Sequence, residues 1–515
     1  MTTFYEQIHK KNTFVDEEEN RISRENMDKW IFSFLLVLIG LLPLIVLGHV
    51  EQVISPLIST VAVLSSGEKG ELFTHYKYLL LVTFTVIILS MFLIKIYFME
   101  AKIRKTFVNY VLSVFLIAIV VSTFFSPNIT IALFGYYSRS DGAISWICYI
   151  ILMFIAMNIN YPKNFVSKIM YTLMPVVYIN LFIITMNFIG KDLVQNTIIQ
   201  SILFSTLPEG ATLGNNSVLV GTLNQWNYMS GMFAMMTVMY LAWAITTKKW
   251  WEALIGTITA AASVSIMFMS TSTSGFLTVV VSAFFLLILL INVENKKAAL
   301  LSLLAFIIIV APIFHILAQK NDNVWKESFG FIINSNPYEK SNISLNSLNG
   351  NLVHASNSTF TLPELPRAGW SAGSGRLYIW DKTIELVKER PIIGYGMDTL
   401  IYNFPHYNID ARAGNYNEKI LVDKPHNMYL GVLYGTGIVG GLAFLLIILY
   451  TTKFALQSVI SKKHLQIAPL GLIVLAFYIQ AMFNDSLPGI SGVAFVLIGV
   501  LVGIIKNEQQ DSELG

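Results

Sequence analysis

Runs of about 20 consecutive apolar residues recur along most of the chain, and this is the length that crosses the hydrocarbon core of a bilayer. Of its 515 residues, 55% are hydrophobic and only 13% are charged. Soluble domains carry about a quarter charged residues, and a soluble multidomain protein would not need so many uninterrupted apolar runs. The sequence therefore predicts an all-α integral membrane protein with about twelve transmembrane helices.

The apolar-run criterion places the candidate spans near residues 31–50, 78–98, 107–125, 142–160, 168–190, 226–246, 250–270, 275–293, 299–318, 427–451, 466–484 and 489–506. The N-terminal stretch is rich in charge and lacks the short apolar core of a signal peptide. We therefore expect five regions: a cytoplasmic tail (1–29), spans one to nine (30–318), one large loop (319–426), spans ten to twelve (427–506) and a second cytoplasmic tail (507–515).

Orientation follows from the lysines and arginines of the short loops, because these residues concentrate on the cytoplasmic side. Every second loop carries such a cluster: Lys102, Arg104 and Lys105; Lys163 and Lys168; Lys248 and Lys249; Lys296 and Lys297; Lys453, Lys462 and Lys463; and finally Lys506. The pattern predicts a multi-pass protein of the cytoplasmic membrane with both termini in the cytoplasm. The segment 319–426 is then external.

The external segment is too long for a plain connection, since loops beyond about 15 residues are usually functional or disordered. Its first part, Asn334 to Asn357, is rich in Asn and Ser, and we expect it to be irregular. From Arg376 to Arg390, apolar residues recur at helical spacing (Leu377, Trp380, Ile384, Val387). Pro391 ends this pattern. The second half is therefore predicted to be a structured cap containing an amphipathic helix.

His426 stands just before span ten, in the stretch Asp423-Lys424-Pro425-His426-Asn427. Histidine can act as a general base near neutral pH, and a helix start at the membrane surface could fix its ring. The alternative is an interfacial histidine that is simply hydrogen-bonded to a neighbour.

Two arginines are candidates for binding an anion, because a guanidinium grips phosphate with two hydrogen bonds. Arg376 opens the predicted cap helix, whose N-terminus adds free N–H groups. Arg139 lies in a short external loop, where cations are uncommon. A structural ion pair is the alternative for each: with Asp381 or another carboxylate of the loop for Arg376, and with Asp141 for Arg139.

Polar residues gather at other predicted external loops, among them Asn224, Asn227, Asn484 and Asp485, and the stretch Ser270 to Gly275. In lipid they would be costly, so they should face the protein interior or a water-filled cavity. We expect one outward-facing polar cavity. Ordinary hydrogen bonds between helices are the alternative for any single asparagine.

Several classes of protein are excluded or disfavoured. The net charge of +3 gives no reason to expect a nucleic-acid partner. The single cysteine, Cys148, excludes an intrachain disulfide. No nucleotide-binding or metalloprotease motif is present, and the eight histidines show no metal-ligand spacing. We therefore expect neither a cofactor nor a metal.

The chain resembles the O-antigen ligase and polymerase family. That family shows an arginine, a tryptophan four residues on, Pro-x-x-Gly-x-Gly, then His-Asn-x-x-Leu and Gly-x-x-Gly. Here these read Arg376, Trp380, Pro391 to Gly396, His426 to Leu430, and Gly437 to Gly440. The stretch Gly221 to Asn227 is similar to the family's Gly-Thr-x-x-x-x-Asn segment. One departure concerns a Ser-Arg-Gly motif at the start of span eight, where this chain has no arginine between Ser270 and Gly275.

The resemblance implies a bacterial transferase that passes a glycan from undecaprenyl diphosphate to an acceptor hydroxyl outside the membrane. It implies that Arg376 binds the diphosphate and that His426 activates or positions the acceptor. Trp380, Tyr395, Asn427, Asn224 and Asn227 are predicted to contact the diphosphate or glycan, and Arg139 to supply the missing cation. The acceptor stays open between a lipid, a growing glycan and a protein, so a ligase, a polymerase and a protein O-oligosaccharyltransferase are alternatives. A flippase for lipid-linked sugars is a rival from another class.

Overall fold

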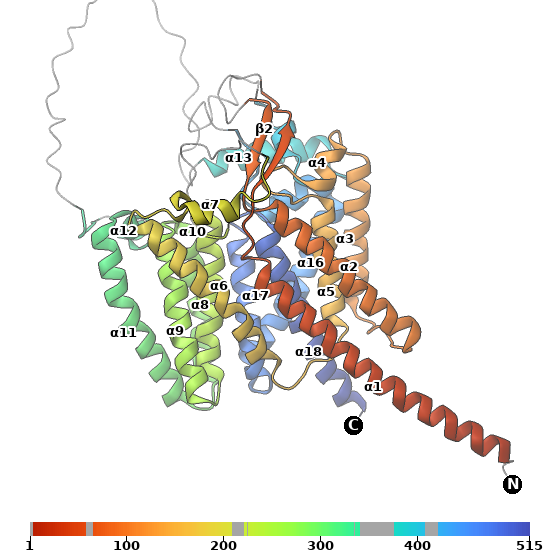
Figure 1. Cartoon of the computed structure of the whole chain (residues 1–515). Helices are drawn as coiled ribbons and strands as arrows, with labels where there is room; N and C mark the ends of the chain where they lie inside the picture. Colours follow the sequence, from red (N-terminus) through yellow and green to blue (C-terminus); the bar gives the residue numbers. More distant parts are fainter. Residues whose placement is uncertain are drawn as a thin grey trace, which may run out of the picture.

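The computed structural model describes residues 4–57, 65–208, 221–223, 225–333, 335–339, 375–406 and 421–514. The chain is predominantly helical, and almost no strand is present in the described part. Figure 1 shows a bundle of long helices with a group of short elements at one end. The predicted class, an all-α integral membrane protein, is confirmed.

Ten helices in the described residues are long and apolar enough to cross a membrane. They are α2 (His75–Phe98), α3 (Phe107–Phe124), α6 (Phe165–Phe188), α8 (Trp226–Thr246), α9 (Trp250–Met269), α10 (Thr273–Asn292), α11 (Lys296–Lys320), α16 (Met428–Ile460), α17 (Ala468–Gln480, preceded by η4, Lys462–Ile467) and α18 (Pro488–Leu514). The predicted number of twelve is not confirmed. The other two predicted spans coincide with the end of α1 (Phe4–Leu41) and with the shorter α5 (Ala143–Met157).

Short elements connect the long helices. They are the antiparallel strands β1 (His49–Val53) and β2 (Gly67–Glu71), with His49 opposite Glu71, and the helices α4 (Ile129–Phe134), η1 (Leu193–Gln195), α7 (Thr197–Leu203), α12 (Asn323–Lys326), η2 (Phe329–Phe331), α13 (Arg376–Glu389) and α14 (Leu400–Asn403). In Figure 1 the hairpin, α4 and α13 lie together above the bundle, and both chain termini lie toward its other end.

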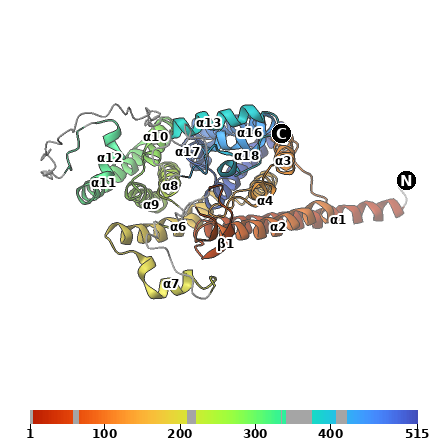
Figure 2. The same cartoon turned by 90° about the horizontal axis from the view of Figure 1, so that it is seen from above.

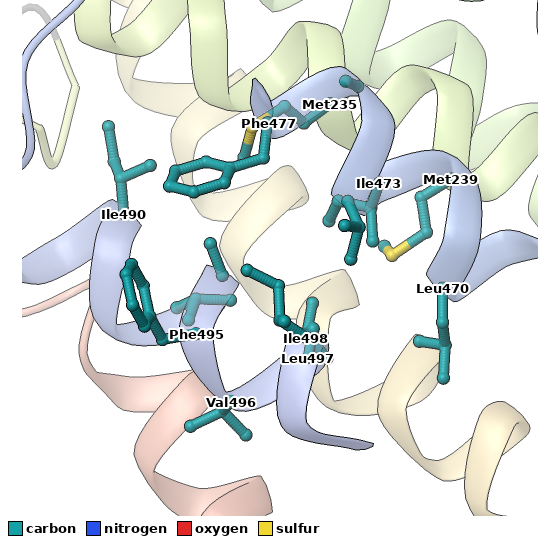
Figure 3. Packing of buried hydrophobic residues seen from close by; sticks show 14 of the residues in the cluster. Met235, Met239, Leu470, Ile473, Phe477, Ile490, Phe495, Val496, Leu497 and Ile498 are labelled. Atoms are coloured by element: carbon teal, nitrogen blue, oxygen red, sulfur yellow. The ribbon is translucent and has the colours of Figure 1, made fainter. Parts of the chain in front are cut away.

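The centre of the bundle is formed by helices that are apolar on every side, which is typical of a buried helix. Figure 3 shows how α8, α17 and α18 pack there through Met235, Phe477 and Phe495. The outermost helices differ, because large apolar side chains of α11, such as Leu301 and Ile308, are exposed. An exposed apolar surface of this kind is expected where a membrane protein contacts lipid.

The predicted cap helix is present as α13, and it ends before Pro391 as expected. Its buried residues are not those of the predicted apolar stripe, however. Tyr378 and Leu386 pack with Tyr395 and Tyr434 of the following segments, whereas Leu377 and Ile384 of the stripe are exposed. In the view from above, α13 lies along the edge of the bundle beside α16 (Figure 2).

Backbone contacts dock the segment after α13 onto a kink in α16. The N–H of Ile438 donates to Pro391 (2.7 Å), and the N–H of Gly396 donates to Gly435 (2.8 Å). Gly437 has φ +65, and a Cβ there would lie 2.3 Å from the carbonyl oxygen of Ile392. Only glycine fits such a conformation and approach. The glycine motifs on both sides of this junction therefore hold the cap on the bundle.

Candidate functional site

The starts of α5, α8, α10, α16 and α18 and the end of α17 meet at one end of the bundle, which we call the site end. His426 lies there, directly before α16, and Asp485 lies between α17 and α18. The opposite end carries Lys102, Lys248, Lys297 and Lys462, and we call it the lysine end. The predicted site residues and these lysines are therefore separated by the length of the helices.

His426 is held in an unusual backbone conformation. Its φ is +51, which is uncommon for a residue other than glycine and persists only where the surroundings enforce it. Before it, the carbonyl of Pro425 accepts a hydrogen bond from Trp380 Nε1 (2.7 Å). After it, Asn427 caps α16 by accepting from the N–H of Leu430 (3.0 Å), and its own N–H donates to Asp485 (3.2 Å). The loop thus aims the imidazole in a fixed direction.

The His426 ring faces the carboxylate of Asp485, with Nδ1 3.0 Å from Oδ2. The Asp485 side chain is 4% exposed, whereas that of His426 is 32% exposed. Burial alone would lower the pKa of His426, but the hydrogen bond and charge of Asp485 raise it above the ordinary value of 6.5. Burial alone would raise the pKa of Asp485, and His426 brings it below 3.8. The pair can orient the imidazole and leave Nε2 for another ligand.

Arg376 is the first residue of α13, and its side chain is half-buried. Its guanidinium makes no hydrogen bond or ion pair with any residue in the described ranges, so the alternative pair with Asp381 is not formed there. Burial lowers the pKa of Arg376, and the charge of Asp485 opposes this. The charge of Arg376 also acts on His426. A half-buried cation that has no partner among the residues the structure describes, next to the histidine, can bind an anion.

Arg139 has the opposite environment, with a side chain that is only 3% exposed. Its Nε lies 2.9 Å from Asp398, and its Nη1 is ion-paired with Asp423. Burial would lower the pKa of Arg139, but these two carboxylates raise it above its ordinary value. The alternative pair with Asp141 is therefore not the one formed. Since Asp423 lies three residues before His426, Arg139 anchors the loop that carries the histidine.

A second buried cation, Lys424, completes this ionic cluster. Its Nζ lies 3.4 Å from Asp141 and 3.8 Å from Asp398. Asp141 also accepts hydrogen bonds from Ser486 and from Tyr149 (3.1 Å). Burial raises the pKa of Asp141 to about 6, although Lys424 opposes the shift. We call Arg139, Asp141, Asp398, Asp423 and Lys424 the ionic cluster.

The other predicted site residues are placed as follows. Asn227 accepts a hydrogen bond from Ser272 (2.7 Å), Ser272 is bonded to Ser274 (3.0 Å), and Ser274 accepts from Asn484 (3.5 Å). These hydrogen bonds link α8, α10 and the end of α17. They correspond to the alternative given for the asparagines, ordinary hydrogen bonding between helices. Asn224 lies outside the described residues.

The two predicted aromatic residues have different surroundings. Tyr395 is buried, stacks on Tyr434 with centroids 5.2 Å apart and donates to Glu389 (2.6 Å). Trp380 is half-buried and bonded to the loop before His426. Trp380 therefore lies next to the site, whereas Tyr395 is part of the packing between the cap and α16. Contact of either residue with substrate stays a prediction.

The structure adds three carboxylates that sequence reasoning did not place in the site: Asp141, Asp398 and Asp485. The sequence predicts Asp485 as one of the polar residues around an outward-facing cavity, but not as the partner of His426. A usable signal was its position beside Asn484 at a helix end, where a charge next to lipid needs a partner. Asp398 of the ionic cluster has φ +60, so it has a strained backbone conformation, as His426 does.

This fold and site define a multi-pass helical membrane protein with a histidine, a carboxylate and a half-buried arginine at one end of its bundle. Residues 258–445 match a family model described as O-antigen ligase, and no significant match among curated proteins was found. The matched range begins in α9, ends in α16 and includes both Arg376 and His426. This match supports the resemblance to the O-antigen ligase and polymerase family. The chain is a bacterial inner-membrane protein that acts on glycans in polysaccharide biosynthesis.

Proposed function

We propose that the protein is a glycosyltransferase that moves a glycan from undecaprenyl diphosphate to an acceptor hydroxyl on the outer face of the cytoplasmic membrane. In this proposal the site end is external, the segment 319–426 forms the catalytic cap, and both tails are cytoplasmic. The single observation that carries it is the guanidinium of Arg376, which is unpaired among the described residues and lies beside the His426–Asp485 pair. These are the parts that a metal-independent transfer from a lipid diphosphate needs.

The diphosphate is the leaving group, and its negative charge increases as the glycosidic bond breaks. Arg376 stabilises that charge through a fixed, half-buried guanidinium, which is worth more there than in water. The N-terminus of α13 adds backbone N–H groups directed to the same place. The polyprenyl tail of the donor stays in the bilayer.

His426 takes the proton of the acceptor hydroxyl at Nε2, while Asp485 stabilises the resulting imidazolium through Nδ1. The acceptor oxygen then forms a bond to the anomeric carbon. The bond from that carbon to the diphosphate oxygen breaks, and its electron pair leaves with undecaprenyl diphosphate. In-line displacement inverts the anomeric configuration.

Arg139 was predicted to replace the arginine that is missing between Ser270 and Gly275. Its burial with Asp398 and Asp423 favours a positioning role instead, in which it holds the loop before His426. Acceptor choice is expected to depend on the segment 319–370, most of which lies outside the described residues. The proposal therefore covers donor and chemistry for a ligase, a polymerase or an oligosaccharyltransferase alike.

A transfer assay in isolated membranes tests the proposal with His426→Ala. Loss of a general base costs about 10²–10⁴-fold in rate. We expect that loss of glycan transfer, with the lipid-linked donor accumulating on the outer face. The matched control is His315→Ala. His315 lies in the last two turns of α11, and its ring is hydrogen-bonded to Tyr338 and Gln319. This control should retain transfer.

Two outcomes would contradict the proposal. Donor that accumulates on the inner face of the His426→Ala membranes would indicate a flippase. Labelling that finds a cysteine introduced beside Arg376 accessible only from the cytosol would separate the site from its donor.

A further inference from the structure

A large cavity lies at the lysine end of the bundle, far from His426. Its volume is about 720 Å³, within the range of about 300–1,000 Å³ that is typical of ligand pockets. It is bounded by the end of α8, the first turns of α9 and α11, the loop between α10 and α11, and η4. In Figure 1 these elements lie at the opposite end of the bundle from α13. The cavity therefore cannot be part of the proposed donor site.

The mouth of this cavity is strongly basic. Lys248, Lys462 and Lys463 line it, against a single carboxylate, Glu294. The ion pair between Lys248 and Glu294 at the mouth is long at 3.9 Å and solvent-exposed. Two more lysines, Lys296 and Lys297, follow immediately in the first turn of α11. The mouth thus has an excess of positive charge, which suits an anionic group.

The walls of the cavity are apolar and open to the lipid-facing surface. Leu254 of α9 and Leu301 of α11 line it, and both side chains are largely exposed. Ala305 and Ile309 continue the α11 wall toward the middle of the membrane. Trp250 lies at the mouth and is also exposed, at the level where tryptophan is enriched in membrane proteins.

We infer that this groove binds a phospholipid with an anionic headgroup. The phosphate lies among Lys248, Lys462 and Lys463, and an acyl chain runs between α9 and α11 along Leu254 and Leu301. Charge at one end and an apolar channel at the other match a lipid better than a soluble anion, which would leave the apolar walls exposed. Basic pockets between transmembrane helices on the cytoplasmic side are known to accept such headgroups. The inference does not depend on the proposed transferase activity.

Tryptophan quenching by brominated lipids tests the inference on the full chain. The protein is reconstituted into phosphatidylcholine vesicles that contain increasing fractions of brominated phosphatidylglycerol or, separately, brominated phosphatidylcholine. The contribution of Trp250 is isolated as the difference between the unmodified chain and Trp250→Phe. We expect brominated phosphatidylglycerol to quench this component at a much lower fraction than brominated phosphatidylcholine does.

Charge removal then tests the role of the lysines. A lysine near an anionic lipid surface contributes roughly a fivefold preference. In Lys462→Gln/Lys463→Gln the preference for phosphatidylglycerol should fall by about tenfold or more. The matched control is Lys102→Gln/Lys105→Gln, which removes two exposed lysines at the same end of the bundle but outside the groove. It should keep the preference of the unmodified chain.

Three results would overturn the inference: equal quenching by both lipids in the unmodified chain, an unchanged preference in the Lys462/Lys463 double variant, or equal losses in that variant and its control. Inorganic phosphate distinguishes the two possible sources of the anion. If millimolar phosphate removes the preference, the groove binds a soluble anion and the lipid assignment is wrong. Unchanged thermal unfolding of the double variants ensures that a lost preference reflects the site.

Discussion

Two arginines at the site end of the bundle have opposite environments. Arg139 is buried between Asp398 and Asp423, so its charge is already compensated within the protein. Arg376 has no partner in the described part of the chain, although its side chain is half-buried beside Asp485. A compensated arginine stabilises the fold, whereas a free one is available to a ligand. The same residue type therefore serves two purposes within one site.

The comparison extends to the carboxylates. Asp398 and Asp423 compensate Arg139 and hold the loops of the ionic cluster together. Asp485 faces His426 and so acts on a group that is partly exposed. The ionic cluster thus fixes the loop 421–427. Because His426 lies in this loop, its position opposite Asp485 depends on the cluster.

The largest effect is expected for Arg139→Ala. Removing one partner of a buried ion pair leaves an uncompensated charge, which costs about 3–5 kcal/mol of stability. Asp423 loses its ion pair with Arg139 and Asp398 is left with Lys424 at 3.8 Å, so the thermal unfolding temperature in detergent should fall strongly. The matched control is Arg21→Ala, because Arg21 also pairs with two carboxylates, Glu18 and Glu25, but in solvent. An unchanged unfolding temperature in Arg139→Ala would break the comparison.

Arg376→Ala should have the converse result, with near-normal stability and a large loss of transfer. Removal of one donor that stabilises a developing anion costs roughly 10²–10³-fold in rate. Arg376→Lys keeps the charge but loses the contact through two hydrogen bonds. Its transfer rate should therefore lie between those of the wild type and Arg376→Ala. Transfer rates and unfolding temperatures are measured on the same preparations.

Lys382→Ala is the control for Arg376→Ala, since it removes a cation from the same helix that is paired with Glu385. It should leave transfer unchanged. If Arg376→Ala retained full transfer while Arg139→Ala abolished it at a temperature where the variant is folded, the two arginines would have exchanged roles.

Much of the fold was predictable because a bilayer imposes a simple rule on helix length. The bounds of α8, α9 and α10 agree closely with their apolar runs, since each run is as long as the membrane is thick. The burial pattern of α13 was not predictable in the same way. Hydropathy does not distinguish an apolar side chain that packs on protein from one such as Ile384 that is exposed at the edge of the bundle.

The site was predictable only where chemistry is local in sequence. Arg376 and His426 stand in recognisable surroundings, at the start of a helix and before a span. Their partners depend on tertiary structure: Arg139 and Asp398 are 259 positions apart, and Asp485 reaches His426 only because the ends of α16 and α17 meet. Residue type and spacing could not have shown that Asp398 pairs with Arg139 or that Asp485 pairs with His426.

The smallest effect on transfer is expected for Asp485→Asn. This variant tests the role of the His426–Asp485 pair most directly. The imidazole loses the carboxylate that orients it, which should lower transfer by less than the loss of the imidazole itself in His426→Ala. The pH dependence is more informative. If His426 is a base, the wild-type rate rises with pH and levels off only above the pKa of His426, which Asp485 holds above 6.5. In Asp485→Asn burial dominates, so the pKa falls and the rising limb moves to lower pH.

Stability should follow the same linkage. A raised histidine pKa stabilises the fold fully below its ordinary value of 6.5, and that contribution is lost as the pH rises through the folded-state pKa. The lowered pKa of Asp485 stabilises the fold above its ordinary value of 3.8 and loses this as the pH falls. Unfolding of the Asp485→Asn variant should therefore differ most from wild type between these two values. A wild-type rate that falls with rising pH would contradict the role of His426 as a base. It would instead indicate that protonated His426 binds the diphosphate as a cation, as proposed for Arg376.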